Sequence, residues 1–469
     1  MSNLERPAGV EGEEWRSLEQ RAEIFDPRTW ASELQAAHER IERHRQSDCV
    51  LVLHDAAGRP LKNTAVRIEQ VRSSFPVGDQ LWGLDALVRD GKAGSDRVRY
   101  QQKRFAELFN AANCLFYWTE RERNDASKTE DFQGEPRLDN VAWQVDFANA
   151  NGLIAKGHPV LWSIPKAWPG WLARYPVETQ MKFAEVRTRS LLARFRGKIR
   201  MYDVVNEPMW EPVPANLPRR HWPHIEPIEH IADFCCQAIQ WCREEDPDAQ
   251  LLINDYGMEQ DTGQRPLGSD GQPVTAARQR ERYIALIAEM KRRGLAPDAV
   301  GLQSHTGGWL TPAQQLGIYQ QFAQTGLPVH ITEFWVHEQD VDPNAKLDPQ
   351  ERSALCAAYA AHYLTLAFSS PHVEAFFFWG AKVLHWRDAL SGHELTPTWH
   401  ALNELLNVKW KTRLLATTDA HGTVRFRGFH GGYRLLYGLD APVQPAESFQ
   451  LDPAQSGPVK LSLRHANAR

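Results

Sequence analysis

The chain has 469 residues, and its 54 Lys and Arg against 59 Asp and Glu give a formal net charge of −5 at pH 7. A charge this mild, without a basic block or a long acidic tail, excludes the charge patterns of proteins that bind nucleic acids or anionic membrane surfaces. No segment is apolar enough to span a membrane, and the length predicts one large domain with a smaller appendage. The expected partner is therefore a neutral molecule.

The N-terminus begins Met-Ser-Asn-Leu-Glu-Arg and stays polar, so it lacks the apolar stretch of a secretory signal. We expect either a cytoplasmic protein or a secreted one whose signal was removed before this numbering begins. The six cysteines show neither a repeated metal-ligand spacing nor a dense disulfide framework, and we expect mostly buried thiols. The oligomeric state stays open.

A charged helical segment over residues 13–45 comes first, and its apolar residues are spaced to pack on a larger body. A β hairpin follows over residues 50–71, and further strand patterns run from residue 413 to residue 437. We expect these two segments to form one small β module, because chain termini often lie close together.

Between the terminal segments, short apolar runs alternate with longer amphipathic stretches, a pattern that predicts β/α units around a parallel sheet. Eight candidate strands begin near Phe75, Asn110, His158, Ile199, Gln250, Ala299, Pro328 and Ala375. Eight such units predict a TIM (β/α)8 barrel. We therefore expect an N-terminal helix and small β unit over 1–72, the barrel over 73–406, and a C-terminal β extension over 407–469.

Two glutamates, Glu207 and Glu333, each follow a short run rich in β-branched residues and precede a residue that ends or redirects regular pairing. Both carboxyl groups should lie at strand carboxyl ends, where barrel enzymes keep their chemistry. Their spacing, 333 − 207 = 126 residues, corresponds to three β/α units of roughly 40 residues, which predicts strands four and seven. Glycosidic bonds are cleaved by such a pair when one carboxyl group is protonated and the other is ionised.

Tryptophan is abundant, with 17 residues, and several fall beside predicted strand ends, where flat rings stack on sugars. These are Trp162, Trp335, Trp379 and Trp386; core packing accounts for about half of all the tryptophans. A metal site built from His158, His305, His330 and Asp255 is a weak alternative, since these residues lie singly on different strands. We expect His330 to be a structural histidine with satisfied hydrogen bonds.

Six motifs taken together resemble glycoside hydrolase family 10, the β-1,4-xylanase family, over roughly Phe75 to Leu406. They are Gly157-His-Pro-Val-Leu-Trp, Asp203-Val-Val-Asn-Glu-Pro, Asn254-Asp-Tyr, Gly301-Leu-Gln-Ser-His, Ile331-Thr-Glu and Trp379-Gly. The tail Phe426-Arg-Gly-Phe-His-Gly-Gly-Tyr is similar to an extension of plant-like members.

The resemblance implies a retaining endo-1,4-β-xylanase that acts on xylan or xylo-oligosaccharides, with Glu207 as acid/base and Glu333 as nucleophile about 5 Å apart. It implies no cofactor and no metal, and a polysaccharide or oligosaccharide as the partner. The substrate-binding residues that it implies, with Tyr256 ambiguous between the cleft and the core, are His158, Trp162, Asn206, Gln303, His305, Trp379, Trp386, Asn113 and Tyr256.

The chain departs from the family at the second strand, which reads Asn110-Ala-Ala-Asn-Cys-Leu-Phe-Tyr-Trp. Asn113 stands in for the family's Asn, but the Glu before it and the Lys after it are missing. Ser163 replaces a His of many bacterial members, and no Asp follows Trp379-Gly. Two alternatives therefore stay open: a glycosidase for another β-glycan or an aryl β-glycoside, and a carbohydrate-binding protein with little turnover.

Overall fold

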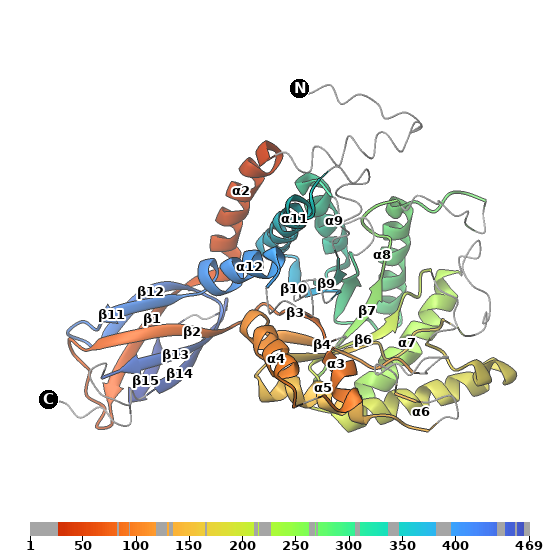
Figure 1. Ribbon diagram of the computed structural model, residues 1–469, viewed down its shortest axis with the longest axis horizontal. Coiled ribbons are helices and arrows are strands. Elements are labelled where there is room, and N and C mark those ends of the chain that lie inside the picture. Colours follow the sequence, from red (N-terminus) through yellow and green to blue (C-terminus); the bar gives the residue numbers. More distant parts are fainter. Residues whose placement is uncertain are drawn as a thin grey trace.

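The computed structural model describes most of the chain and shows a barrel with a β module at its side (Figure 1). The described residues are 27–81, 84–92, 94–118, 129–130, 135–164, 167–210, 214, 227–261, 268, 271–304, 310–335, 347–380, 395–438, 446–454 and 457–463.

Eight parallel strands close the barrel in the order β10-β3-β4-β5-β6-β7-β8-β9, which confirms the TIM (β/α)8 prediction. Their bounds are β3 (Val77–Gln80), β4 (Ala111–Leu115), β5 (Ile154–His158), β6 (Met201–Asn206), β7 (Gln250–Asp255), β8 (Ala299–Leu302), β9 (Val329–Phe334) and β10 (Val373–Phe378). The strand start expected near His158 was wrong, because β5 ends there and begins at Ile154. The Lys, Gly and His of β5 are not strong strand formers, which hid the strand in the sequence.

Helices cover the outside of this barrel (Figure 1). The main ones are α4 (Asp96–Leu108), α5 (Asp139–Ala150), α6 (Val177–Phe195), α7 (Ile228–Glu245), α8 (Ala276–Arg292), α9 (Pro312–Phe322), α11 (Pro349–Ser369) and α12 (Pro397–Asn403). Short turns of helix lie at α3 (Leu84–Leu87), η1 (Val88–Lys92), η2 (Gly170–Arg174), η4 (Ala323–Thr325) and η6 (Glu404–Lys409). Thr311 and Asp348 each form a capping box at a helix start, which satisfies otherwise unpaired backbone N–H groups.

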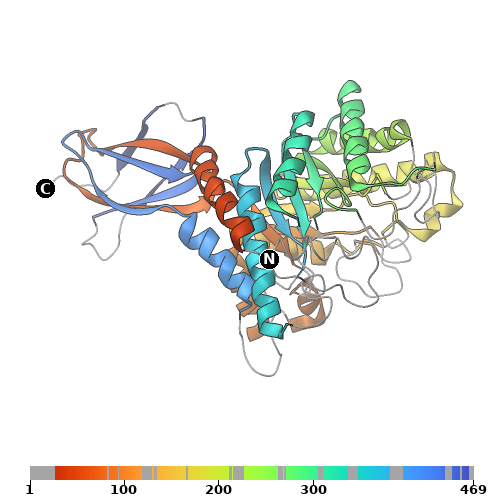
Figure 2. The ribbon, with the colours of Figure 1, turned by 90° about the horizontal axis from the view of Figure 1, so that it is seen from above.

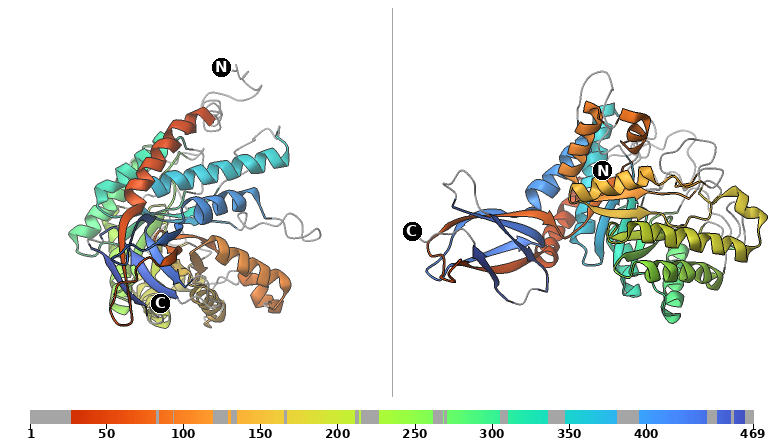
Figure 3. Two further views of the ribbon diagram at one scale, coloured as in Figure 1. Left: turned by 90° about the vertical axis from the view of Figure 1, so that its left-hand side faces the viewer. Right: turned by 90° about the horizontal axis from the view of Figure 1, so that it is seen from below.

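The β module combines both ends of the chain, as predicted. The hairpin expected over residues 50–71 was wrong, because its two strands, β1 and β2, pair with C-terminal strands in different sheets and not with each other. One sheet has the order β12-β1-β15 and the other the order β11-β2-β13-β14. The bounds are β1 (Gln46–Asp55), β2 (Ala65–Ser73), β11 (Arg413–Thr417), β12 (Thr423–Phe429), β13 (Gly431–Tyr437), β14 (Ala446–Leu451) and β15 (Val459–Leu463). Figure 3 shows the red and orange N-terminal strands interleaved with the blue C-terminal ones. The domain boundaries after residues 72 and 406 stay a proposal.

Helix α2 (Pro27–Arg45) joins the module to the barrel, and Figure 2 shows it beside α11. Its Trp30 is buried and meets Tyr359 edge to face, with ring centroids 6.0 Å apart. At its other end, the Arg45 guanidinium donates to the carbonyl oxygens of Ser370 and Val373 at 2.7 and 2.6 Å. The predicted helix therefore packs on the barrel over its described part, while residues 13–26 lie outside the described residues.

The barrel interior changes from apolar to polar along its axis. Its amino-terminal end is filled by Ala111, Met201, Leu252, Ala299, Ala375 and Phe377. Strand side chains alternate between faces, so the next inward residues follow two positions later. On β4, β6 and β7 these are the polar or charged residues Asn113, Asp203 and Asn254, so polar groups lie nearer the carboxyl ends of these strands, where barrel enzymes keep their chemistry.

All six cysteines are buried thiols, as expected. Among the described residues, none of the helices has the length and apolar character needed to cross a membrane.

Candidate active site

Glu207 follows directly on β6 and adopts a left-handed backbone conformation with φ +59°. This conformation costs a non-glycine residue on the order of 1 kcal/mol and is found mainly at functional sites. The Glu207 N–H donates to the carbonyl oxygen of Asn254 at 2.7 Å, which ties the turn to the neighbouring strand β7. The side chain is 8% exposed, so its carboxyl group lies at the opening of the barrel interior.

Glu333 lies on β9 at a bulge. Between Ile331 and Phe334 the strand has one residue more than β10 opposite it. The consecutive residues Thr332 and Glu333 therefore both reach one side chain, that of Asn254. The Thr332 hydroxyl donates to Asn254 Oδ1, and Asn254 Nδ2 donates to Glu333 Oε1 at 2.7 Å.

Close packing supports this arrangement, because Gly301 on β8 leaves room for the Asn254 amide. A Cβ atom at Gly301 would lie 2.6 Å from Asn254 Oδ1. A larger residue at this position would displace the group that holds Glu333.

Gln303, just after β8, connects the two carboxyl-bearing segments. Its Nε2 donates to Glu207 Oε1 at 2.9 Å, and its carbonyl oxygen accepts the N–H of Glu333 at 3.1 Å. Asn206 completes the network, since its Oδ1 accepts from Asn254 Nδ2 at 2.8 Å and from Gln303 Nε2 at 3.3 Å. The predicted residues Glu207, Glu333, Asn206 and Gln303 thus meet in one hydrogen-bonded group.

A buried ionic row lies on the other side of Glu333. Asp203 Oδ2 is hydrogen-bonded to Lys156 Nζ and lies 2.7 Å from His158 Nδ1. His158 Nε2 lies 3.8 Å from Glu333 Oε1, and all three members of the row are almost fully buried. Burial alone would raise the pKa of Asp203, but the charge of Lys156 and the hydrogen bond with His158 lower it. Because Asp203 is ionised, we infer that His158 donates from Nδ1.

Burial raises the pKa of the Glu333 carboxyl group well above its usual value, and the negative charges of Glu207 and Asp203 raise it further. Lys156 and the hydrogen bond from Asn254 oppose the rise. A carboxyl group whose pKa is raised by burial and by a neighbouring carboxylate keeps its proton to higher pH, so the two groups titrate as a pair. Acid and nucleophile chemistry needs a singly protonated pair.

Aromatic side chains form one wall of the site. Trp162 Nε1 donates to Glu207 Oε2 at 2.8 Å. The Tyr117 ring lies 5.4 Å from that of Trp162 and 6.0 Å from that of His158, and Trp379 lies 5.0 Å from His158 on edge. The structure therefore brings the predicted residues His158, Trp162 and Trp379 to the carboxyl groups.

Tyr256 lies beyond β7 and is only partly buried. Its ring stacks on Trp210 at 5.6 Å, and Trp210 Nε1 donates to its carbonyl oxygen at 2.6 Å. The Tyr256 ring thus borders the same end of the barrel as Glu207.

Asn113 was expected to bind a sugar in the cleft, but it lies below the level of the carboxyl groups. It lies in the middle of β4 opposite Lys156 and is fully buried, and neither polar atom of its amide has a hydrogen-bond partner among the described residues. His158 pairs two positions further along, with Leu115, so Asn113 lies one layer below the carboxyl groups. Its sugar-binding role stays a prediction without structural support. His305 and Trp386 lie outside the described residues.

His330 corrects an expectation. It is buried on β9 beside Gly301 and Ala375, yet within the described part of the chain neither ring nitrogen has a hydrogen-bond partner. Burial, followed by the charge of Lys156, lowers its pKa to about 3, so the ring is neutral. Within the part of the chain that the structure describes, no cluster of His, Cys, Asp and Glu is arranged to hold a metal ion.

Sequence reasoning missed the roles of Lys156, Asp203 and Tyr117. Lys156 precedes His158 by two residues, and Asp203 lies inside the Glu207 motif. The period of two along a strand was the available signal that places each of them on the inward face.

Comparisons with known proteins identify the family and the fold of the chain. The model of glycosyl hydrolase family 10 matches residues 119–399, more than half of the chain. Endo-1,4-beta-xylanase 1 of Arabidopsis thaliana is 23% identical over 431 residues, which are 89% of this chain and 39% of that protein. Beta-1,4-xylanase of Dictyoglomus thermophilum is 29% identical over 212 residues, 44% of this chain and 54% of that protein.

Anti-sigma-I factor RsgI6 of Acetivibrio thermocellus is 24% identical over 416 residues, 87% of this chain and 47% of that protein. The chain thus spans about half the length, or less, of these three curated relatives. Among solved structures, a GH10 endoxylanase from a sugarcane soil metagenome has a TM-score of 0.52 at 17% identity, over 71% of this chain and 96% of that one. A GH10 protein from Paenibacillus barcinonensis has a TM-score of 0.51 at 19% identity, over 72% and 96%. These two likenesses concern the fold alone.

Proposed function

The chain belongs to glycosyl hydrolase family 10, and from this premise we propose that it is a retaining glycoside hydrolase that cleaves β-1,4-linked xylan or xylo-oligosaccharides. One observation carries the proposal: Glu207 and Glu333 share a single amide network through Asn254 and Gln303. We assign Glu207 as acid/base and Glu333 as nucleophile.

In the first step, Glu207 gives its proton to the glycosidic oxygen while a carboxylate oxygen of Glu333 attacks the anomeric carbon. The bond to the leaving sugar breaks, and a glycosyl ester forms on Glu333. In the second step, Glu207 takes a proton from water, whose oxygen attacks the anomeric carbon and releases Glu333. Two inversions retain the anomeric configuration.

The surroundings support this division of roles. The row of Lys156, Asp203 and His158 ends next to Glu333. Burial and the charges of Glu207 and Asp203 raise the pKa of Glu333, and Lys156 opposes this rise and favours the ionised form that attacks. A rigid donor that is already in place stabilises charge without the cost of reorganisation. The neighbouring rings of Trp162, Tyr117 and Trp379 offer apolar faces that suit a pyranose ring.

A glycosidase with a shifted substrate is the second candidate. The buried position of Asn113 favours it, because the amide expected to hold the next sugar lies beneath the site. Tyr117 stands against Trp162 and His158 in the wall of the site. The complete carboxyl network argues against the third alternative, a binding protein with little turnover.

Azide rescue tests the roles of Glu207 and Glu333, because the anomeric configuration of the glycosyl azide product differs between the two variants. Glu333→Ala should lose turnover, and azide should then yield the glycosyl azide of inverted configuration. Glu207→Ala with an activated substrate should yield the retained azide, because attack on the glycosyl ester still occurs. Glu374→Ala, a change at the exposed glutamate of β10, is the matched control and should give no azide product. The same stereochemistry from both variants would refute the assignment.

The substrate is tested by product analysis with xylan, arabinoxylan, β-glucan and xylo-oligosaccharides. Release of short xylo-oligomers supports the xylanase proposal. Cleavage of β-glucan alone would establish the second candidate.

A further inference from the structure

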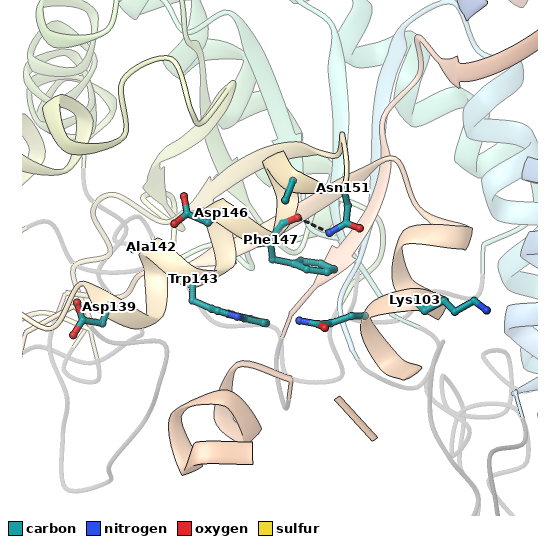
Figure 4. Close-up of a pocket in the computed structure, with 9 residues that line it drawn as sticks. Lys103, Asp139, Ala142, Trp143, Asp146, Phe147 and Asn151 are labelled. Carbon is teal, nitrogen blue, oxygen red and sulfur yellow. Dashed lines mark hydrogen bonds between the residues drawn. The ribbon is translucent and has the colours of Figure 1, made fainter. Parts of the chain in front are cut away.

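A second concave surface lies on the outside of the barrel, between α4 and α5 (Figure 4). It has a volume of about 620 Å³, and we call it the α5 groove. Its lining includes Gln102, Lys103, Asp139, Trp143, Asp146 and Asn151. None of these residues takes part in the network around Glu207 and Glu333.

The regular spacing of α5 creates the groove. Asp139, Trp143 and Asp146 lie three or four residues apart, so they line one side of the helix, and Asn151, the C-cap residue of α5, lines the groove at its end. At 1.5 Å per residue, this face extends about 18 Å, which accommodates several linked sugar rings. In a (β/α)8 barrel, a helix starts at the catalytic face of the sheet. The Asp139 end of the groove therefore opens toward the side of the barrel that carries Glu207 and Glu333.

Trp143 is a supported flat ring at the centre of this groove. It stacks on Phe147 with centroids 5.8 Å apart and 12° between the planes. Phe147 is buried in the main core, while Trp143 is only partly buried. Figure 4 shows both rings beside the space between α4 and α5. A partly exposed indole on a rigid base is a suitable platform for stacking a sugar ring.

Polar groups with hydrogen-bonding capacity surround this ring. Asp139 and Asp146 present carboxylates, and Asn151 donates to the carbonyl oxygen of Phe147 at 2.9 Å, which fixes its amide. Lys103 is the one cation among the described lining residues, and it lies 3.9 Å from Glu107. Asp146 lies 3.8 Å from Lys198, so this carboxylate is paired as well. The lining thus carries two carboxylates and one lysine that is paired with Glu107, a balance that disfavours an anionic ligand such as nucleic acid. Carboxylates and amides instead accept hydrogen bonds from hydroxyl groups.

We propose that the α5 groove is a second, non-catalytic binding site for a β-linked glycan chain, with Trp143 as its stacking platform. This inference rests on the proposed function, which supplies a polymer of that class. A polymer held at two sites of one molecule stays near the cleft after each cleavage. The groove therefore favours action on long or insoluble glycans over action on short oligosaccharides.

The test measures binding of the full chain in the Glu333→Gln background, where no cleavage consumes the ligand. Trp143→Ala should weaken association with insoluble xylan roughly three- to tenfold, the range expected for one aromatic contact. Its affinity for xylotriose, which fits the catalytic cleft, should stay at the parent value. Trp171→Ala is the matched control, because Trp171 is also partly buried on the outside of the barrel and meets Phe183 at 4.9 Å.

Two further variants protect the test against misfolding. Trp143→Tyr keeps a ring and should recover most of the xylan binding. Asp146→Ala alters a carboxylate whose side chain is 70% exposed, so it should weaken binding without unfolding the chain. Equal xylan binding by Trp143→Ala and the parent would overturn the proposal, as would a loss confined to Trp171→Ala.

The outcomes also separate this inference from the proposed function. If the parent binds xylotriose and the wild type cleaves it, but no variant of the groove alters xylan binding, the groove proposal alone fails. If the wild type cleaves no xylose substrate and binds none, the proposed substrate fails first. The same variants would then be compared on the glycan that the wild type does cleave, where an unchanged affinity of Trp143→Ala would overturn the groove.

Discussion

Asn254 donates a hydrogen bond from Nδ2 to Glu333 Oε1 over 2.7 Å. Thr332 sets the orientation of that amide, because its hydroxyl donates to the opposite end, Oδ1. The residue next to the proposed nucleophile thus determines that a donor, and not an acceptor, faces the carboxyl group.

Asn254→Asp should therefore damage the site severely. It replaces a donor with a second acceptor beside Glu333 and adds a negative charge. Loss of a hydrogen bond to a charged group costs about 1.5–3 kcal/mol. The value of kcat/KM for an aryl β-xyloside should therefore fall by roughly 10-fold to 100-fold. Thr332→Val should cost less, and Thr332→Ser should be close to wild type. Wild-type kinetics for Asn254→Asp would show that this contact has no role in the reaction.

Glu207→Ala should discriminate between leaving groups. A substrate with a good leaving group needs no proton from the acid to release that group, whereas xylan does. We expect kcat/KM on xylan to fall roughly 10²- to 10⁴-fold, and kcat/KM on a dinitrophenyl β-xyloside to change much less. The measurement is the dependence of kcat/KM on leaving-group pKa. An equal loss on both substrates would argue against Glu207 as the acid.

Glu207→Gln should shift a pH profile. Burial is the main cause that raises the pKa of Glu333, and the charge of Glu207 is the next. A neutral glutamine removes the second cause, so the pKa of Glu333 falls and its carboxylate forms at lower pH. The acid limb of kcat/KM for an activated glycoside should therefore move to lower pH. A limb that stays in place would mean that the two carboxyl groups do not interact.

Asp203→Asn tests the buried row. The change leaves Lys156 as an unpaired buried charge, which should cost about 3–5 kcal/mol in the free energy of unfolding. It also replaces the anionic acceptor that orients His158 with a neutral amide. Adding Lys156→Met should restore much of the stability without restoring activity, because His158 still lacks its anionic partner. Recovery of activity in the double variant would show that Asp203 serves stability alone.

His330→Gln should flatten the pH dependence of stability. Folding keeps His330 neutral down to about pH 3, whereas in the unfolded chain it takes up a proton near pH 6.5. Its contribution to stability is thus present above pH 6.5 and lost as the pH falls toward 3, by an amount on the order of 4 kcal/mol.

The measurement is urea unfolding of the wild type and His330→Gln between pH 7 and pH 4.5. The variant should lose less stability over this range. His421→Gln, at an exposed turn before β12, is the control and should keep the wild-type dependence. The same slope for His330→Gln and the wild type would contradict the prediction.

The alternation of strand and helix signals was enough to predict the barrel, because a parallel sheet covered on both faces leaves a strong and repeated apolar pattern. The same local signals predicted that Glu207 and Glu333 end or nearly end their strands. The β module was predictable from strand patterns at both ends of the chain, but the pairing of its strands was not: β1 and β2 join different sheets instead of forming the expected hairpin.

Only the closed barrel decided which side chains meet. Lys156 and Asp203 are 47 residues apart, and Asn254 and Glu333 are 79 apart, so no local pattern connects them. The bulge in β9 aims both Thr332 and Glu333 at Asn254, and the register of β4 puts Asn113 beneath the site. A shift of one residue in register turns a side chain to the other face. Sequence by itself therefore determined the architecture and the carboxyl pair, while strand register, a tertiary property, decided the hydrogen bonds and charges around that pair.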